Sequence, residues 1–168
     1  MKNQKAKLMT NDKEFIPINI AIVTISDTRT FENDKSGDVL QKRILDSGHL
    51  ILKREIVKDE FQKISELFLD LINDKKIDVI ISTGGTGLTG RDITPEVMKT
   101  LFEKTIDGFG EMFRWMSYKK IGTSALQSRA LAGVSRGTYI FCLPGSPSAC
   151  RDGWDDILVY QLDIRHKP

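Results

Sequence analysis

The sequence contains few of the residues that bind transition metals or form disulfides. Its two cysteines, Cys142 and Cys150, are eight positions apart and form no Cys-x-x-Cys pair. Its two histidines, His49 and His166, follow a glycine and an arginine, and neither has the setting of a metal ligand or a catalytic base. We therefore expect reduced, structural thiols, and neither a zinc centre nor a disulfide framework.

The sequence also lacks a long apolar run. No segment approaches the roughly 20 residues that a membrane-spanning helix needs, and residues 1–14 lack the apolar stretch of a secretory signal. Apolar residues make up 40% of the 168 residues, which is ordinary for a globular protein. These observations predict a cytoplasmic protein with no membrane partner.

No excess of charge of either sign is present. The 25 basic and 23 acidic side chains leave a net charge of +2, and residues 1–14 account for all of it. A nucleic-acid-binding domain normally has a basic face, so we expect no nucleic-acid partner. We interpret residues 1–14 as a disordered polar tail and residues 15–168 as one domain.

Apolar patterns predict strands that alternate with helices. Runs rich in isoleucine and valine are typical of strands buried on both faces, whereas residues 50–58 alternate more and should lie nearer a sheet edge. Strands are predicted at 16–26, 50–58, 78–83 and 138–143, and helices at 36–47, 61–72, 94–103, 111–120, in a short turn at 126–130, and from 147 onward. This order predicts an α/β fold with three layers (α/β/α) and a mostly parallel sheet.

Residues 82–95, STGGTGLTGRDITP, are the most informative segment. Four of them are glycines, and they lie between a predicted strand and a predicted helix. Glycine lets backbone N–H groups approach a ligand closely, so such a loop can bind anions. Asp92 in the same loop would repel a phosphate unless a cation lies between them. The loop therefore suggests a phosphorylated substrate together with Mg²⁺.

Three polar loops follow predicted strands, at residues 26–28, in the glycine loop, and at residues 144–147. Ligands of open α/β sheets bind beyond the carboxyl ends of the strands. We therefore expect the three loops to converge on one site.

Two common nucleotide motifs are excluded. Residues 85–90 match G-x-G-x-x-G, but the third glycine of that motif should lie inside the following helix. Pro95 best fits the first helical position, which leaves Gly90 outside the helix. The acidic residue expected about 20 positions on would be Glu111, which is within a predicted helix. No Gly-Lys-[Ser/Thr] follows, so the loop is not a P-loop either.

Three separated segments carry a resemblance to a known family: STGGTGLTGRDITPE, GFGEMFR and SRALAGVSRGTYIFCLPGSPSA. They make residues 18–166 similar to the MoaB/MogA family of molybdenum cofactor biosynthesis proteins, whose superfamily includes the gephyrin G domain. The segment YKKIGTSALQSRALAGV resembles the MoaB type more than MogA. The resemblance implies a three-layer α/β fold and a homotrimer, or a dimer of trimers (a homohexamer), that works with other proteins of the same pathway.

The resemblance further implies an adenylyl transfer. In active members the terminal phosphate of molybdopterin attacks the α-phosphate of Mg-ATP, which gives adenylylated molybdopterin and pyrophosphate. ATP and molybdopterin would be the substrates and Mg²⁺ the cofactor. Such a reaction depends mainly on positioning and charge neutralisation, so it needs few reactive side chains.

Roles for particular residues are also implied by the resemblance. Asp92 and Asp59 would be catalytic, and Asp92 would also contact Mg²⁺. The implied nucleotide-binding residues are Gly84, Gly85, Thr86, Gly87, Ser26 and Asp27. The implied molybdopterin-binding residues are Gly145, Ser146, Pro147, Ser128 and Arg129.

The same side chains can also be interpreted as having structural roles only. Asp92 can form a turn or an outer helix cap, and Asp59 can form a capping box with Gln62. Ser146 and Pro147 suit the cap and first position of an ordinary helix.

Two other functions are open as well. Some MoaB-type members are doubted as enzymes, so a non-catalytic molybdopterin-binding or scaffold protein is the second hypothesis, although the presence of Asp92, Thr94 and Pro95 favours catalysis. Domains of this kind also occur in CinA-type proteins, which suggests nucleotide pyrophosphatase activity, but no separate hydrolytic motif is visible.

Overall fold

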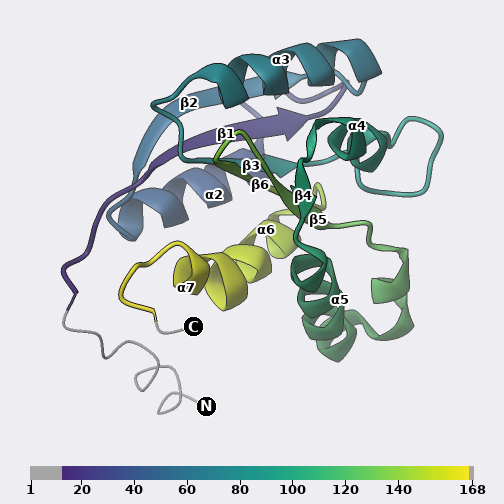
Figure 1. The fold of residues 1–168 in the computed structure, drawn as a ribbon. Coiled ribbons are helices and arrows are strands. Elements are labelled where there is room, and N and C mark those ends of the chain that lie inside the picture. The colour runs from purple at the N-terminus through teal and green to yellow at the C-terminus, as the bar shows by residue number, and fades with distance from the viewer. Residues whose placement is uncertain (1–12, 167–168) are drawn as a thin grey trace.

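The computed structural model describes residues 13–166. Residues 1–12 of the predicted tail lie outside the described residues. The described part of the chain forms a six-stranded sheet with the order β2-β1-β3-β6-β5-β4 (Figure 1). The strands are β1 (Asn19–Ile25), β2 (Leu50–Val57), β3 (Val79–Thr83), β4 (Lys104–Thr105), β5 (Leu131–Ser135) and β6 (Thr138–Leu143).

Helices cover both faces of this sheet. They are α2 (Lys35–Asp46), α3 (Phe61–Asn73), α4 (Thr94–Leu101), α5 (Asp107–Ile121), the 3₁₀ turn η1 (Gly122–Gln127), α6 (Pro147–Gly153), the π-helical turn η2 (Trp154–Leu158) and α7 (Val159–Gln161). Side chains of α2, α5, α6 and η2 form one core cluster with the sheet, and α3 and α4 form the other. The predicted three-layer α/β fold is confirmed.

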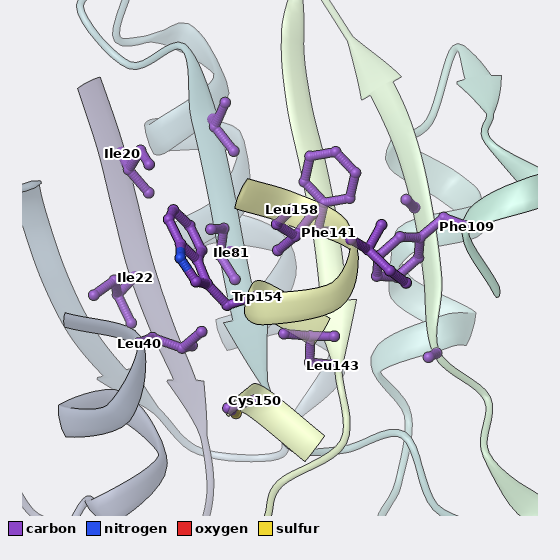
Figure 2. Close-up of a cluster of buried hydrophobic side chains, with 14 of the residues drawn as sticks. Ile20, Ile22, Leu40, Ile81, Phe109, Phe141, Leu143, Cys150, Trp154 and Leu158 are labelled. Atoms are coloured by element: carbon purple, nitrogen blue, oxygen red, sulfur yellow. The ribbon is translucent and has the colours of Figure 1, made fainter. Parts of the chain in front are cut away.

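The central strands are buried on both faces, as their apolar runs predicted. All five residues of β3 are buried, and so are six of the seven in β1. Figure 2 shows Trp154 of η2 among Ile20 and Ile22 of β1 and Ile81 of β3, all within one core cluster. Within residues 13–166, none of the helices has the length and apolar character needed to cross a membrane.

Strand pairing agrees with the predicted sheet and adds an antiparallel part. β2, β1, β3 and β6 pair in parallel, and β2 lies at the edge, as expected. β5 pairs antiparallel with β6 and with β4. The two-residue strand β4 was not predicted, because both of its residues are exposed and polar and carry no apolar pattern.

Helix α5 begins at Asp107, four residues earlier than predicted. Its first turn contains two glycines, which have low intrinsic helix propensity. Burial of Phe109, whose ring lies 5.2 Å from that of Phe141, offsets this cost. A Cβ at Gly110 would lie 2.6 Å from the Ala130 carbonyl oxygen, so the close packing of this turn requires glycine there. Contacts with Phe141 of β6 and with Ala130, which directly precedes β5, therefore favour a helix that begins at Asp107.

The two thiols are free and buried, in agreement with a structural role. Burial raises the pKa of Cys142 to about 12 and that of Cys150 to about 11. Because the thiolate is the reactive form, we expect neither thiol to react with a disulfide reagent in the folded protein at neutral pH. Titration before and after unfolding in guanidinium checks this. Rapid labelling of either thiol under native conditions would contradict it.

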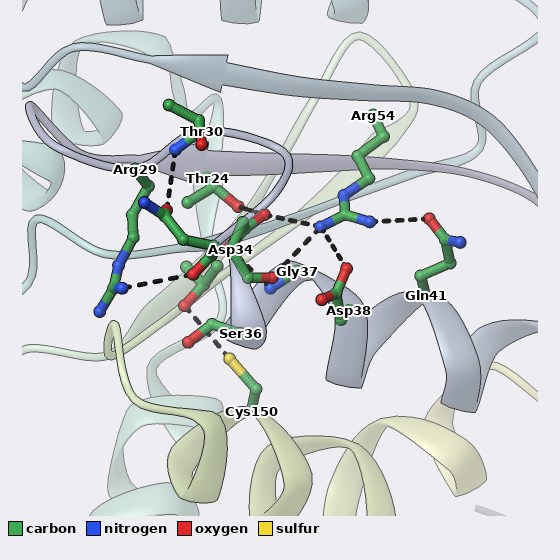
Figure 3. Close-up of polar contacts among 12 residues, drawn as sticks. Thr24, Arg29, Thr30, Asp34, Ser36, Gly37, Asp38, Gln41, Arg54 and Cys150 are labelled. Atoms are coloured by element: carbon green, nitrogen blue, oxygen red, sulfur yellow. Dashed lines mark hydrogen bonds and ion pairs between the residues drawn. The ribbon is translucent and has the colours of Figure 1, made fainter.

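A buried ion pair joins β1, β2 and α2 (Figure 3). The Asp34 side chain is fully buried, and it accepts hydrogen bonds from Thr24 Oγ1 at 2.8 Å, Arg54 Nη2 at 2.9 Å and the Gly37 N–H at 3.0 Å. The Gly37 bond makes Asp34 the N-cap of α2. Two residues after Asp34, Ser36 Oγ donates to the Gly145 carbonyl at 3.0 Å. The pair thus fixes α2 beside the loop that follows β6.

Candidate functional site

The glycine loop follows β3 and contacts the ends of both neighbouring strands. The Gly84 N–H donates to the Leu143 carbonyl of β6 at 3.0 Å. Gly84 and Gly85 have φ angles of 103° and 65°, which L side chains rarely adopt. A Cβ at Gly84 would also lie 2.2 Å from the Ile25 carbonyl oxygen of β1. Glycine is therefore required here for the loop to cross between the two strands.

The loop closes onto the start of α4. The Thr94 N–H donates to the Gly85 carbonyl at 3.0 Å, and Thr94 Oγ1 donates to the Gly84 carbonyl at 3.1 Å. The sequence predicts Pro95 at the first position of this helix. Helix α4 begins at Thr94, so Pro95 occupies the second position. Gly90 is outside the helix, which confirms the reason given for excluding a dinucleotide fingerprint.

The loop after β6 lies directly against the glycine loop. Thr83 Oγ1 donates to the Pro144 carbonyl at 2.9 Å, and a Cβ at Gly145 would lie 3.3 Å from the Gly84 Cα. Ser146 caps α6 by accepting from the Ala149 N–H at 3.1 Å, and Pro147 is the first residue of that helix. The predicted helix start is confirmed, and two of the three predicted loops do converge.

The loop after β1 is organised by its own side chains. Ser26 Oγ accepts from the N–H groups of Thr28 and Arg29 at 3.3 and 3.2 Å. Asp27 accepts from the Asp59 N–H at 3.3 Å, and its other oxygen lies 2.6 Å from Arg91 of the glycine loop. These contacts bring the third predicted loop to the same edge of the sheet.

Asp92 forms a turn within the glycine loop. Its Oδ2 accepts from Thr89 Oγ1 at 2.6 Å and from the Thr89 N–H at 2.9 Å. Burial by itself raises the pKa of Asp92, but the Thr89 and Gly87 hydrogen bonds and the charge of Arg129 lower it below its ordinary value. Asp92 therefore carries a negative charge at neutral pH, on the wall of a cavity.

Asp59 faces the glycine loop and does not cap α3. The predicted capping box is wrong, because the N-cap of α3 is Glu60 and its side chain makes no capping hydrogen bond. The Asp59 carboxylate lies 3.5 Å from the Ile93 N–H, and a Cβ at Gly85 would lie 3.2 Å from its Oδ2. Burial raises the pKa of Asp59, and the nearby carboxylates of Asp92 and Asp27 raise it further.

Replacing Asp59 by asparagine is expected to raise the melting temperature near neutral pH. The pKa of Asp59 is higher in the folded protein than in the unfolded chain, so ionisation of this carboxyl opposes folding. The contribution of protonated Asp59 to stability is fully present below pH 3.8 and is lost as the pH rises through the folded-state pKa. Asparagine has no such ionisation. The gain should shrink as thermal melts are repeated toward pH 3.8. An equal or lower melting temperature for the variant at neutral pH would contradict this expectation.

Arg129 directs its donors into the glycine loop. Its Nε donates to the Gly87 carbonyl at 2.8 Å, its Nη2 donates to the Asp92 carbonyl at 2.5 Å, and its Nη1 pairs with Glu96 of α4. The neighbouring Ser128 lines the cavity. The contacts of Arg129 thus hold the loop in shape, a role that the sequence analysis did not predict.

A cavity of about 440 Å³ lies between these loops and α5. It brings together many of the predicted residues, namely Gly84, Gly85, Thr86, Gly87, Asp92, Ser128, Gly145 and Ser146. Residues that the sequence analysis did not single out complete its wall, among them Phe113, Ser117, Lys120, Gln127, Ser148 and Asp152. They come from α5, η1 and α6, far from the glycine loop in the sequence, and carried no local motif.

Other predicted residues lie outside the lining of this cavity. Ser26 lines a neighbouring cavity of about 210 Å³, which also contacts Gly84 and Gly145. Asp27, Asp59 and Arg129 support the glycine loop through the contacts described above. Within residues 13–166 no group of three or more histidine, cysteine or acidic side chains is arranged to hold a metal ion.

Comparisons with known proteins agree on one family. A family model described as a probable molybdopterin-binding domain matches residues 21–164. The chain is 45% identical over 155 residues to molybdenum cofactor biosynthesis protein B of Escherichia coli K12, covering 92% of this chain and 91% of that protein. It is 41% identical over 157 residues to the protein of the same name from Bacillus cereus, covering 92% and 93%.

Solved structures support the same assignment. A crystal structure of molybdenum cofactor biosynthesis protein B matches with a TM-score of 0.87 at 40% identity, covering 89% of this chain and 94% of that one. The tungsten cofactor synthesizing protein MoaB from Pyrococcus furiosus matches with a TM-score of 0.76 at 34% identity, covering 84% and 91%. The chain therefore belongs to the MoaB/MogA family of molybdenum cofactor biosynthesis proteins, as a member of the MoaB type.

Proposed function

We propose that this protein acts in molybdenum cofactor biosynthesis by transferring the adenylyl group of Mg-ATP to molybdopterin. The observation that carries the proposal is a single cavity bounded by the glycine loop with its charged Asp92 and by the loop at Gly145 and Ser146. An adenylyl transfer needs two phosphorylated substrates held side by side. The family match to a probable molybdopterin-binding domain supports molybdopterin as one of them.

In the proposed reaction the terminal phosphate oxygen of molybdopterin forms a bond to the α-phosphorus of ATP. The bond from that phosphorus to the oxygen that bridges the α- and β-phosphates breaks, and pyrophosphate leaves. The backbone of Gly84, Gly85, Thr86 and Gly87 would approach the nucleotide phosphates, because all four residues line the cavity and backbone N–H groups of such a loop can bind anions. Gly145, Ser146 and Pro147, with Ser128, would contact the phosphate end of molybdopterin.

Mg²⁺ enters this proposal as part of the nucleotide substrate. It commonly binds one or two protein carboxylates together with substrate phosphates and water, so a cage of three protein ligands is not needed. Asp92 suits such a contact, because it is ionised at neutral pH and lines the cavity. When bound, the metal would offset the charge on the phosphates. Asp59 and Asp27 would add negative potential beside it, and Arg129 would hold the loop.

The proposal includes a homotrimer, or a dimer of trimers, in the cytoplasm. Three large side chains of α5 support an assembly through this helix, because Met112, Trp115 and Tyr118 are 51%, 61% and 59% exposed. Exposed aromatic side chains that lie together on one helix are typical of interfaces. Other proteins of the pathway would supply molybdopterin and receive the product.

Pyrophosphate release from Mg-ATP, with and without molybdopterin, tests the proposed function. Release that requires molybdopterin and matches its amount is expected. Release without molybdopterin would instead identify a nucleotide pyrophosphatase. No release in either case, with molybdopterin bound to the protein, would leave a binding or scaffold protein.

A further inference from the structure

One wall of the cavity carries an ion pair that the proposed reaction does not use. Lys120 at the end of α5 and Asp152 at the end of α6 both line the cavity, and Lys120 Nζ lies 2.6 Å from Asp152 Oδ1. A second acid, Asp156 of η2, lies 3.7 Å from the same ammonium group. The side chains of Lys120 and Asp152 are 51% and 25% exposed, so a ligand in the cavity can reach both.

The charge balance of this wall disfavours an anionic group. The Lys120 ammonium is already paired with Asp152, and the Asp156 carboxylate also lies within 4 Å of it. The hydrogen bond to Asp152 raises the pKa of Lys120, so the lysine stays protonated at neutral pH. A phosphate would therefore compete with these carboxylates for the lysine, whereas the glycine loop offers backbone donors. The phosphates of a bound substrate therefore belong at the loop, and a neutral polar group belongs at the ion pair.

The pair presents a donor and an acceptor side by side. Lysine has three N–H donors and a carboxylate has about four acceptor positions, so each group keeps capacity after the contact between them. The complementary ligand is a flat, neutral group with an acceptor next to donors. The aminopyrimidinone edge of a pterin has this order: a ring carbonyl, then a ring N–H, then an exocyclic amine.

We propose that Lys120 and Asp152 recognise the aminopyrimidinone edge of the pterin ring. Lys120 donates to the ring carbonyl, and Asp152 accepts from the ring N–H and the exocyclic amine. That the ligand is a pterin rests on the proposed function. The pattern of donors and acceptors that the ligand must match comes from the Lys120–Asp152 ion pair alone. Phe113, Ser117 and Gln127 line the same cavity and would surround the ring.

A purely structural role is the competing explanation of this pair. A partly exposed ion pair between two helices contributes little to stability, so a structural role predicts little change in any ligand preference when the pair is broken. Recognition makes a different prediction, because the site would discriminate between ligands that differ only at the amine. A lumazine has a carbonyl in place of that amine, and this carbonyl would face the Asp152 carboxylate.

Competition against bound molybdopterin tests the proposal, with 6-hydroxymethylpterin and 6-hydroxymethyllumazine as probes. The wild type should prefer the pterin by about 10- to 100-fold, the scale of a lost hydrogen bond to a charged group. Asp152→Asn should remove most of this preference. Asp46→Asn is the matched control, since it breaks a Lys–Asp pair of 2.9 Å on the exposed surface of α2, outside the cavity, with the same change of charge. The control should retain the full preference.

The outcomes separate this inference from the proposed function. Equal competition by the two probes in the wild type overturns the inference. This result does not depend on whether a variant folds, because only the wild type is measured. A preference that persists in Asp152→Asn overturns it too, as does a wild type that fails to bind molybdopterin. A pterin preference that depends on Asp152, in a protein that forms no adenylylated product, supports the inference and refutes the proposed transfer.

Discussion

Asp92→Asn is expected to lower the rate of adenylyl transfer by about 10²- to 10³-fold, the scale of losing one electrostatic group in an active site. The pKa of Asp92 is below its ordinary value, so the change removes a negative charge from the cavity wall. Asparagine keeps an oxygen that can accept from the Thr89 N–H, so the turn should persist. Single-turnover rates at saturating Mg-ATP measure the effect, and thermal melts verify the fold.

Thr89→Val is the matched control for this prediction. It removes the 2.6 Å hydroxyl bond to Asp92 but keeps the carboxylate charge. A small loss of rate in Thr89→Val beside a large loss in Asp92→Asn would assign the effect to the charge. Equal losses in both variants would assign it to the turn, and a wild-type rate in Asp92→Asn would show that the carboxylate has a structural role alone.

Arg54→Met is expected to lower the free energy of unfolding by about 3–5 kcal/mol, the usual cost of leaving one member of a buried ion pair unpaired. The Asp34 side chain is fully buried, and Arg54 Nη2 lies 2.9 Å from its Oδ2. Thr24 and the Gly37 N–H would remain as its hydrogen-bond partners. Because Asp34 also caps α2, the helix that positions Ser36 should become less stable. Urea denaturation measures the change.

Arg43→Met provides the comparison for this variant. Arg43 Nε lies 2.8 Å from Asp155 Oδ1, but the Asp155 side chain is 44% exposed. Water can solvate that carboxylate after the change, so the expected loss is below about 1 kcal/mol. Similar losses in the two variants would contradict the distinction between the buried and the exposed pair.

The fold could be predicted where a single physical pattern dominates a segment. Strands β1 and β3 are buried on both faces, so their sequences are rich in isoleucine and valine and show little alternation. The start of α6 follows from the local chemistry of Ser146 and Pro147. The capping box predicted at Asp59 was wrong, because an acid three positions before a polar residue occurs in many structural contexts. The Asp59 carboxylate instead accepts a hydrogen bond from the Ile93 N–H at the end of the glycine loop.

The site could be predicted in part, for a comparable reason. Loops at the carboxyl ends of parallel strands must share one edge of the sheet, so the glycine loop and the loop at Gly145 were expected to meet. Lys120 and Asp152 meet only because α5 and α6 pack beside the same cavity, and their separation in the sequence carries no periodic signal. The contacts of Arg129 likewise depend on the three-dimensional path of the loop.

The fate of a labelled α-phosphate tests the proposed transfer most directly. Excess protein would be mixed with molybdopterin and Mg-ATP labelled at the α-phosphate, and the products would be separated by chromatography. If the protein transfers the adenylyl group, the label moves into a pterin-containing product in an amount equal to the molybdopterin supplied, and a γ-phosphate label does not. Molybdopterin recovered bound but unlabelled, with the label still in ATP, would contradict the proposed adenylyl transfer.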